Sequence, residues 1–420
     1  MIRSFGARGA ATVAVGMVTL YFLWRAVVTG LVEGDLPALA NDPSRATDVL
    51  RWDGGYAPAL RQRAAAPSLT PAQSLELWRR AIVADPTDWL APFVVATRLL
   101  DEGQRERGQQ ILSRLVVLSP GDVRLRLQLG DFYLREKQPQ DALPQFSAAL
   151  TLRPVLGQKV YERLLAIMVT YPDLAGIDAL IREGPPWWSS FFQYAAQVTP
   201  QLAVVRRLYL RRRELAGGAM TRPEHFAMIA RLKRERQWEE AYLTWLNALP
   251  TAQWRFAGGL YNGGFELPLS RGGFGWQVLP LRNTAVNTQR TYGMTGTQAL
   301  HVVFRHPLKR FHHLYQPLLL APGLYHLRGK VRVDNLQTNQ GVRWEIHCAD
   351  SPYRRLAASA AFRGSAKWQY FAVVFTVPGN DPTCVSQRLQ LVVAGQTKDD
   401  FRVRGDLWFD DMQIKRVVSG

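Results

Sequence analysis

VRLRLQLGDFYLREKQPQDALPQFSAALTLRP, from Val123 to Pro154, is the stretch that decides the fold of the first part of this chain. Pro86, Pro120 and Pro154 follow one another at intervals of 34 residues. Between them, small and large side chains recur at matching places, with Gly108, Leu112 and Leu115 corresponding to Ala142, Phe146 and Ala149. This periodicity predicts successive helix pairs, in which small residues let the helices approach and large ones fill the gap. An ordinary helical bundle with evenly spaced prolines is the alternative.

The pattern resembles the tetratricopeptide repeat. The resemblance implies an all-α solenoid of about five or six helix pairs over residues 55–250, some of them degenerate. It also implies a concave groove, lined by the first helix of each pair, that binds a protein partner. The family's groove positions fall on Leu90, Phe93, Thr97, Leu100, Arg124, Leu127, Asp131 and Leu134. The alternative is that the apolar members of this set only pack against neighbouring helices.

The first 33 residues predict a transmembrane anchor. Residues 9–24 carry no charge, and apolar character continues beyond Arg25 to Val32. A helix of this length spans a bilayer. Arginines precede the segment and acidic residues follow it, so the positive-inside rule places the N-terminus in the cytoplasm and the bulk of the chain in the periplasm, at a bacterial inner membrane. A signal peptide cleaved after Ala40 and a buried soluble helix are the alternatives. Residues 34–54 are expected to form a tether.

Composition indicates folded domains with anionic partners. A chain of 420 residues is too long for a single domain core, so more than one domain is expected. Of these residues 47% are hydrophobic, and the net charge is +18. Two basic clusters stand out, Arg206–Arg213 and Arg231–Arg236, and each forms either a solvated face or a surface for lipid headgroups or an acidic partner. Nucleic acid is not expected as a partner, because the predicted compartment holds little of it and no aromatic ladder is interleaved with the charges.

After Pro250 the helical periodicity ends and short alternating runs begin. In one of them Val342, Trp344, Ile346 and Cys348 alternate with polar residues. Seven or eight such strands predict an all-β antiparallel sandwich over residues 251–420. A hairpin turning at residues 335–341 would place basic side chains on one outer face, where an acidic polysaccharide could bind. These candidates are Arg328, Lys330, Arg332, Arg343 and His347. A solvated outer face is the alternative.

Residues 255–417 resemble the jelly-roll carbohydrate-binding modules. The opening motif Asn262-Gly-Gly-Phe-Glu266 and the closing motif Gly405-Asp-Leu-Trp-Phe-Asp-Asp-Met-Gln-Ile414 carry the resemblance, with Trp368 between them. It implies a structural calcium ion held by Glu266 with Asp410 or Asp411. The alternative is that these acids cap strand ends or meet arginines. Cys348 and Cys384 flank the strand that follows Trp368, so a disulfide is expected in an exported protein, with two free thiols as the alternative.

The sequence contains none of the catalytic motifs GxSxG (a nucleophile elbow), HExxH (a zinc-binding helix) or the Walker phosphate-binding loop. The sequence therefore predicts a non-enzymatic protein with no cofactor beyond the calcium ion. Its layout is similar to accessory proteins of bacterial exopolysaccharide or surface glycan assembly, which implies a membrane-anchored periplasmic scaffold. A glycan-binding receptor in which the helices act only as a spacer is the alternative.

Overall fold

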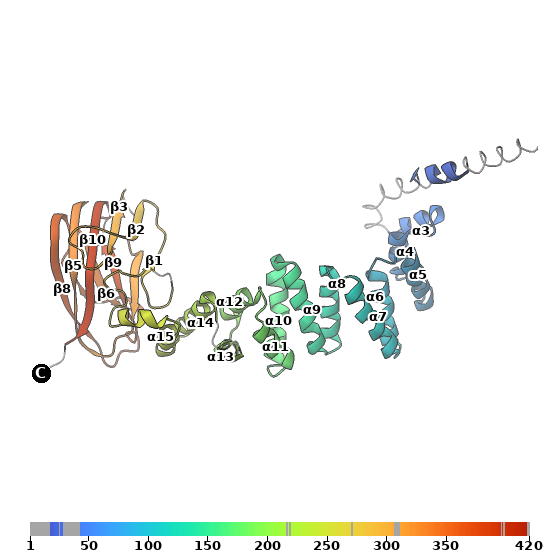
Figure 1. The fold of residues 1–420 in the computed structure, drawn as a ribbon, viewed down its shortest axis with the longest axis horizontal. Coiled ribbons are helices and arrows are strands. Elements are labelled where there is room, and N and C mark those ends of the chain that lie inside the picture. Colours follow the sequence, from blue (N-terminus) through green and yellow to red (C-terminus); the bar gives the residue numbers. More distant parts are fainter. Residues whose placement is uncertain are drawn as a thin grey trace, which may run out of the picture. The chain divides into compact units, whose positions relative to one another are not determined.

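The computed structural model describes residues 17–24, 26–27, 43–215, 217, 220–269, 272–305, 311–395, 397 and 400–417. The chain divides into two compact units, Met1–Leu156 and Gly157–Gly420. The first is helical, and the second holds further helices and two β-sheets (Figure 1). Helices α10–α15, which the sequence places with the repeats, therefore belong to the same compact unit as the sandwich.

The first unit consists of helices that pack on their neighbours in sequence. They are α3 (Pro43–Trp52), α4 (Ala57–Ala64), α5 (Pro71–Ala84), α6 (Leu90–Asp101), α7 (Arg105–Leu118), α8 (Val123–Arg135) and α9 (Pro139–Leu152), with a 3-10 turn at Pro154–Leu156. The pairs α4–α5, α6–α7 and α8–α9 confirm the predicted helix pairs. The expected tether is wrong over residues 43–52, because Ala46 and Val49 of α3 pack against Ala59 of α4.

Small and large residues meet inside each pair as the repeat requires. A Cβ atom at Gly130 of α8 would lie 2.6 Å from the Phe146 ring of α9. At Gly108 of α7 it would lie 2.5 Å from the Leu100 side chain of α6. These contacts leave no room for a side chain, which explains why glycine stands at both places.

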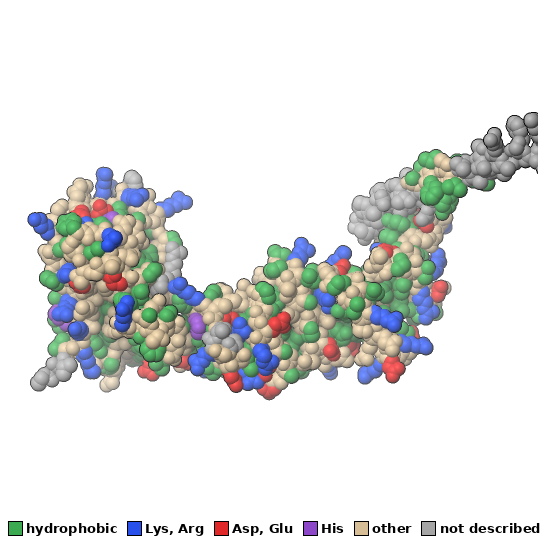
Figure 2. All heavy atoms as spheres, in the orientation of Figure 1, with side chains coloured by type: hydrophobic (Ala, Val, Ile, Leu, Met, Phe, Trp, Pro, Cys, Tyr) green, Lys and Arg blue, Asp and Glu red, His purple; other side chains and the backbone are tan. Residues whose placement is uncertain are grey.

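Further helices open the second unit: α10 (Gly157–Thr170), α11 (Ala175–Glu183), α12 (Trp188–Val198), α13 (Leu202–Leu215), α14 (Arg222–Arg234) and α15 (Trp238–Asn247). Arginines bridge them. The Arg206 guanidinium on α13 binds Glu240 on α15 at 2.6 and 2.9 Å. Arg211 donates to Asp178 on α11 at 2.8 Å. Several arginines of the basic clusters thus hold helices together and are not a solvated face. Figure 2 shows Asp and Glu side chains interspersed among the Lys and Arg side chains of the visible surface.

The sandwich that follows has two five-stranded antiparallel sheets, ordered β1-β4-β9-β6-β7 and β2-β3-β10-β5-β8. The strands are β1 (Gln277–Val278), β2 (Thr284–Gln289), β3 (Ala299–Phe304), β4 (Leu314–Leu318), β5 (Gly323–Thr338), β6 (Val342–Cys348), β7 (Ser351–Ala358), β8 (Gly364–Val377), β9 (Gln387–Val393) and β10 (Val403–Arg416). The core between the sheets contains Trp276, Trp344 and Phe409. The predicted sandwich is confirmed, and β1, β2, β4 and β7 are strands that the sequence pattern did not indicate.

The expected hairpin is wrong. β5 and β6 are consecutive in sequence, but they lie in different sheets. The turn between them crosses the sandwich, so the outward side chains of β5 and those of β6 face opposite sides.

In the part of the chain that the structure describes, no helix is both long and apolar enough to cross a membrane. The predicted anchor lies largely outside that part. Residues 17–24 are described, and they form a helix whose apolar side chains are exposed.

Candidate functional site

The outer face of the β1-β4-β9-β6-β7 sheet gathers polar and aromatic side chains. Val342, Trp344 and Ile346 of β6 enter the core, so the intervening Arg343, Glu345 and His347 point outward. The register extends this pattern across the sheet, because Glu345 lies opposite Gln390 of β9, which lies opposite Tyr315 of β4. In the next row His347 lies opposite Arg388.

Glu345 is the centre of a hydrogen-bonded network. One carboxylate oxygen accepts from Arg343 Nε at 2.8 Å and Arg355 Nη1 at 3.0 Å, and the other lies 2.8 Å from His347 Nε2. Burial raises the pKa of Glu345, but hydrogen bonds from His347 and Arg343 outweigh it and lower the pKa to about 2. The carboxylate therefore stays charged and fixes the orientation of all three basic side chains.

His347 is oriented through one ring nitrogen. Its side chain is buried, and Nδ1 has no hydrogen-bond partner among the described residues. Since Nε2 faces a carboxylate, we assign the ring proton to Nε2 when His347 is neutral, which makes Nδ1 an acceptor. Nδ1 has almost no accessible surface, so it belongs to the interior and not to the surface that a ligand would contact.

Arginine and an aromatic ring complete this face. The Arg388 guanidinium lies 4.5 Å from the centre of the Tyr315 ring. Arg355 is about half exposed, since its side chain keeps 48% of its surface. The face thus offers guanidinium donors and a ring surface. This combination suits a ligand that carries both carboxylate and hydroxyl groups.

Arg332, Lys330 and Arg328 lie on the other sheet, apart from Arg343 and His347. Arg332 is buried between the rings of Tyr292 and Trp408, at 4.6 and 4.7 Å from their centres, and also binds Asp334 at 2.9 Å. Lys330 pairs with Asp411 at 2.6 Å. Arg332 and Lys330 are therefore paired with acidic side chains of the protein itself. Of the three β5 candidates, Arg328 is the exposed one, and it is hydrogen-bonded to Gln413 at 3.0 Å. The single basic face predicted from sequence is therefore wrong.

The three calcium candidates converge on the loop before β3. Glu266 accepts the Thr297 N–H at 2.9 Å, and buried Asp410 accepts the Thr295 N–H at 2.6 Å. Asp411 faces the Lys330 ammonium. No described group of three His, Cys, Asp or Glu side chains is close enough to hold a metal ion. Because N–H groups and an ammonium already face these oxygens, this arrangement does not fit a calcium ion.

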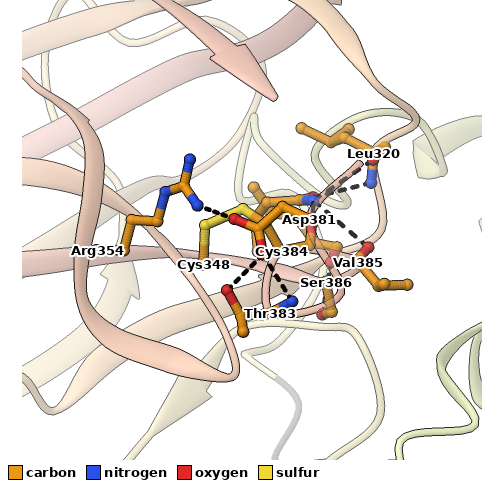
Figure 3. The surroundings of a disulfide bond; sticks show 10 residues. Leu320, Cys348, Arg354, Asp381, Thr383, Cys384, Val385 and Ser386 are labelled. Carbon is orange, nitrogen blue, oxygen red and sulfur yellow. Dashed lines mark hydrogen bonds and ion pairs between the residues drawn. A yellow bond between two sulfur atoms is a disulfide. The ribbon is translucent and has the colours of Figure 1, made fainter. Parts of the chain in front are cut away.

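The predicted disulfide is confirmed. Cys348, at the end of β6, is bonded to Cys384 in the loop before β9 (Figure 3). The loop is held in place around it, because Asp381 accepts from the Thr383 N–H at 2.8 Å and pairs with Arg354. The bridge therefore anchors the end of the strand that carries the Glu345 network.

The groove candidates on α6 and α8 differ in exposure. Phe93 is buried and meets Phe132 edge to face with 6.1 Å between ring centres. It belongs to the core, so its prediction as a groove residue is wrong. The Thr97 hydroxyl donates to the Val94 carbonyl at 3.0 Å. Some surface remains exposed on Leu90, Thr97, Leu100, Arg124, Leu127, Asp131 and Leu134.

Comparison with known proteins gives likenesses of fold only. No family model and no curated protein matches this chain. A structure titled "CBM4 structure and function" is 15% identical, with 37% of this chain and 98% of that one covered and a TM-score of 0.27. The protein pilF of Pseudomonas aeruginosa is 17% identical, with 53% and 90% covered and a TM-score of 0.27. YrrB, "a TPR protein with an unusual peptide-binding site", is 13% identical, with 48% and 90% covered and a TM-score of 0.23.

Proposed function

We propose that this chain is a non-catalytic adaptor that binds an acidic glycan on the outer face of the β1-β4-β9-β6-β7 sheet and a protein on its helices. The observation that carries the glycan half is the two guanidinium groups on this face, the half-exposed Arg355 held by Glu345 and Arg388 over the Tyr315 ring. A sugar carboxylate would pair with Arg355 or Arg388.

The cellular location of the chain is part of the same proposal, and the charges on either side of the N-terminal apolar segment support it. Arg3 and Arg8 precede the apolar segment, and Glu33 and Asp35 follow it. We place the helices and the sandwich outside the bacterial cytoplasm, anchored at the inner membrane, in the assembly of an exopolysaccharide or surface glycan. A reporter fused after Leu50 tests the topology, and activity confined to the cytosol would contradict it.

A glycan receptor whose helices act only as a spacer is the second candidate. Contacts between α14–α15 and the sandwich favour the adaptor. Trp238 donates to Asp350 at 3.2 Å, and Trp245 meets Tyr261 edge to face with 5.0 Å between ring centres. The last helix pair is thus built into the sandwich, whereas a spacer needs no such interface.

Affinity electrophoresis of the full-length protein through gels containing acidic or neutral polysaccharides tests the glycan half. We expect retardation by an acidic polysaccharide, and the double variant Arg355→Ala/Arg388→Ala should reduce it at least tenfold. Arg328→Ala, on the opposite face, is the matched control and should migrate as the parent protein does. Retardation lost only with Arg328→Ala, or no retardation by any polysaccharide, would reject the glycan half.

A further inference from the structure

The second unit has an apolar groove with arginines at its rim. It lies along α12 and α14, has a volume of about 800 Å³, and reaches the segment before β1 at Leu269. Its apolar lining consists of Ala196, Pro223, Phe226, Ala227, Ala230 and Leu269. The small side chains in the middle of α14 leave space where larger residues would close the groove.

The charged residues lining this groove are all arginines. Arg231 is buried and donates to carbonyl groups at and just beyond the end of α12, at 3.1 Å to Ala196 and 2.8 Å to Pro200, so it stabilises the fold. Arg222 and Arg234 are exposed. The Nη2 group of Arg234 donates to the Ala196 and Gln197 carbonyls at 2.9 and 3.2 Å, so Arg234 offers a ligand its other N–H groups. Glu224, the acidic residue in the first turn of α14, is fully buried and pairs with Arg212 at 3.6 Å. The rim is therefore positive.

Arg222 and Arg234 stand at the two ends of α14, twelve residues apart. At a rise of 1.5 Å per residue they are separated by about 18 Å along the helix. An extended chain covers this distance in about five residues at roughly 3.4 Å each. Because successive side chains of an extended chain point to opposite sides, carboxylates at the first and seventh residues share one side and, about 20 Å apart, would reach both guanidinium groups.

A second hollow adjoins the groove. It measures about 430 Å³ and shares Arg222, Phe226 and Leu269 with the first. Trp245 and Tyr261 also line it. A large apolar side chain near the Arg222 end of the same segment would bury its surface here, which supplies binding free energy beyond the charge pairing.

We propose that this groove binds an extended protein segment of about seven residues, apolar between its two acidic ends. The proposal deepens the protein-binding half of the function given above and rests on it. It moves the partner site from α6 and α8 to α12 and α14 and makes Leu269, at the edge of the sandwich, part of the site.

Fluorescence anisotropy with two synthetic heptapeptide libraries tests this. One library has Glu at positions 1 and 7, the other has Lys there, and both carry Leu, Ile, Phe or Met between them. We expect the full-length protein to bind the Glu library at least tenfold more tightly, with affinity falling as salt rises. Arg222→Glu/Arg234→Glu should reverse the preference, and Ala230→Trp should block both libraries. Arg213→Glu, on α13, is the matched control and should leave binding unchanged.

A misfolded variant would lose binding to both libraries. A reversed preference for the Lys library therefore shows that the variant is folded and that the two arginines contact the peptide. Equal binding of the two libraries, binding of neither, or no reversal would overturn the proposal. Loss of polysaccharide retardation in Arg222→Glu/Arg234→Glu would also overturn it, because the groove would then hold the glycan. Failure here leaves the glycan half standing, since that half depends on Arg355 and Arg388.

Discussion

Lys233 on α14 places its ammonium 4.1 Å from the centre of the Phe274 ring and donates to the carbonyl of Gly273. This contact joins the last helix pair to the segment that opens the sandwich. The pKa of Lys233 falls to about 7, because burial disfavours the charged form and Arg388 repels it. The junction between helices and sandwich thus contains an amine that titrates near neutral pH.

Replacing Lys233 should change how stability depends on pH. Since its pKa is lower in the folded protein than in the unfolded chain, the unfolded chain binds more protons between about pH 7 and pH 10.5. Stability contributed by this group therefore rises with pH across that window and is lost as pH falls toward 7. We expect Lys233→Met to flatten the rise of the melting temperature between pH 7 and pH 10. Parallel curves for the two proteins would contradict the lowered pKa.

Breaking the disulfide should destabilise the sandwich. Cys348 and Cys384 are 36 residues apart, and closing a loop of this length removes chain entropy worth about 4 kcal/mol from the unfolded state. We expect Cys348→Ala/Cys384→Ala to lower the free energy of unfolding in urea by about that amount. Reductant should destabilise the parent protein and leave the variant unaffected, which serves as the control.

Gly130→Ala should destabilise the first unit, although alanine normally favours a helix. The new methyl group would lie 2.6 Å from the Phe146 ring, which must move. We expect a loss of about 1–3 kcal/mol in urea unfolding, typical of overpacking. Gly121→Ala is the matched control, because a Cβ atom there meets nothing within 4 Å. Equal stability of the two variants would show that the close contact between Gly130 and Phe146 does not limit the packing of α8 on α9.

Asp410 should titrate far above an ordinary aspartate. Burial raises its pKa to about 6, and the neighbouring Asp411 adds to the effect. The folded protein therefore binds more protons than the unfolded chain between about pH 4 and pH 6, and the stability that this group contributes falls as pH rises through that window. Carboxyl carbon NMR of the labelled protein measures the pKa directly.

The same titration tests the calcium expectation. A calcium ion among Glu266, Asp410 and Asp411 would favour the charged carboxylate and lower the Asp410 pKa. Because Lys330 already pairs with Asp411 at 2.6 Å, we expect added Ca²⁺ to leave the pKa unchanged. A drop of one unit or more would mean that the ion displaces Lys330.

The difference between sequence and structure is clearest at Arg388 and Tyr315. Neither is a candidate from the sequence, because β4 is a short strand that contains Pro317, and Arg388 lies near the start of β9 with no motif around it. Knowing that β4 and β9 pair would have revealed them, since Tyr315 lies opposite Gln390, two residues from Arg388. Arg355 was missed for a related reason, because β7 did not stand out as an alternating run.

The sequence by itself determined the helix pairs and the core-facing side of β6. Each depends on neighbours along the chain: Gly130 meets Phe146 one helix later, and alternation places Trp344 in the core. Only the tertiary structure decided which strands share a sheet, and hence that Arg332 is buried between aromatic rings while Arg343 and His347 gather around Glu345 on the opposite face. Alternation along a strand predicts which face of the sheet each side chain lies on. The choice of partner strand depends on contacts between residues distant in sequence.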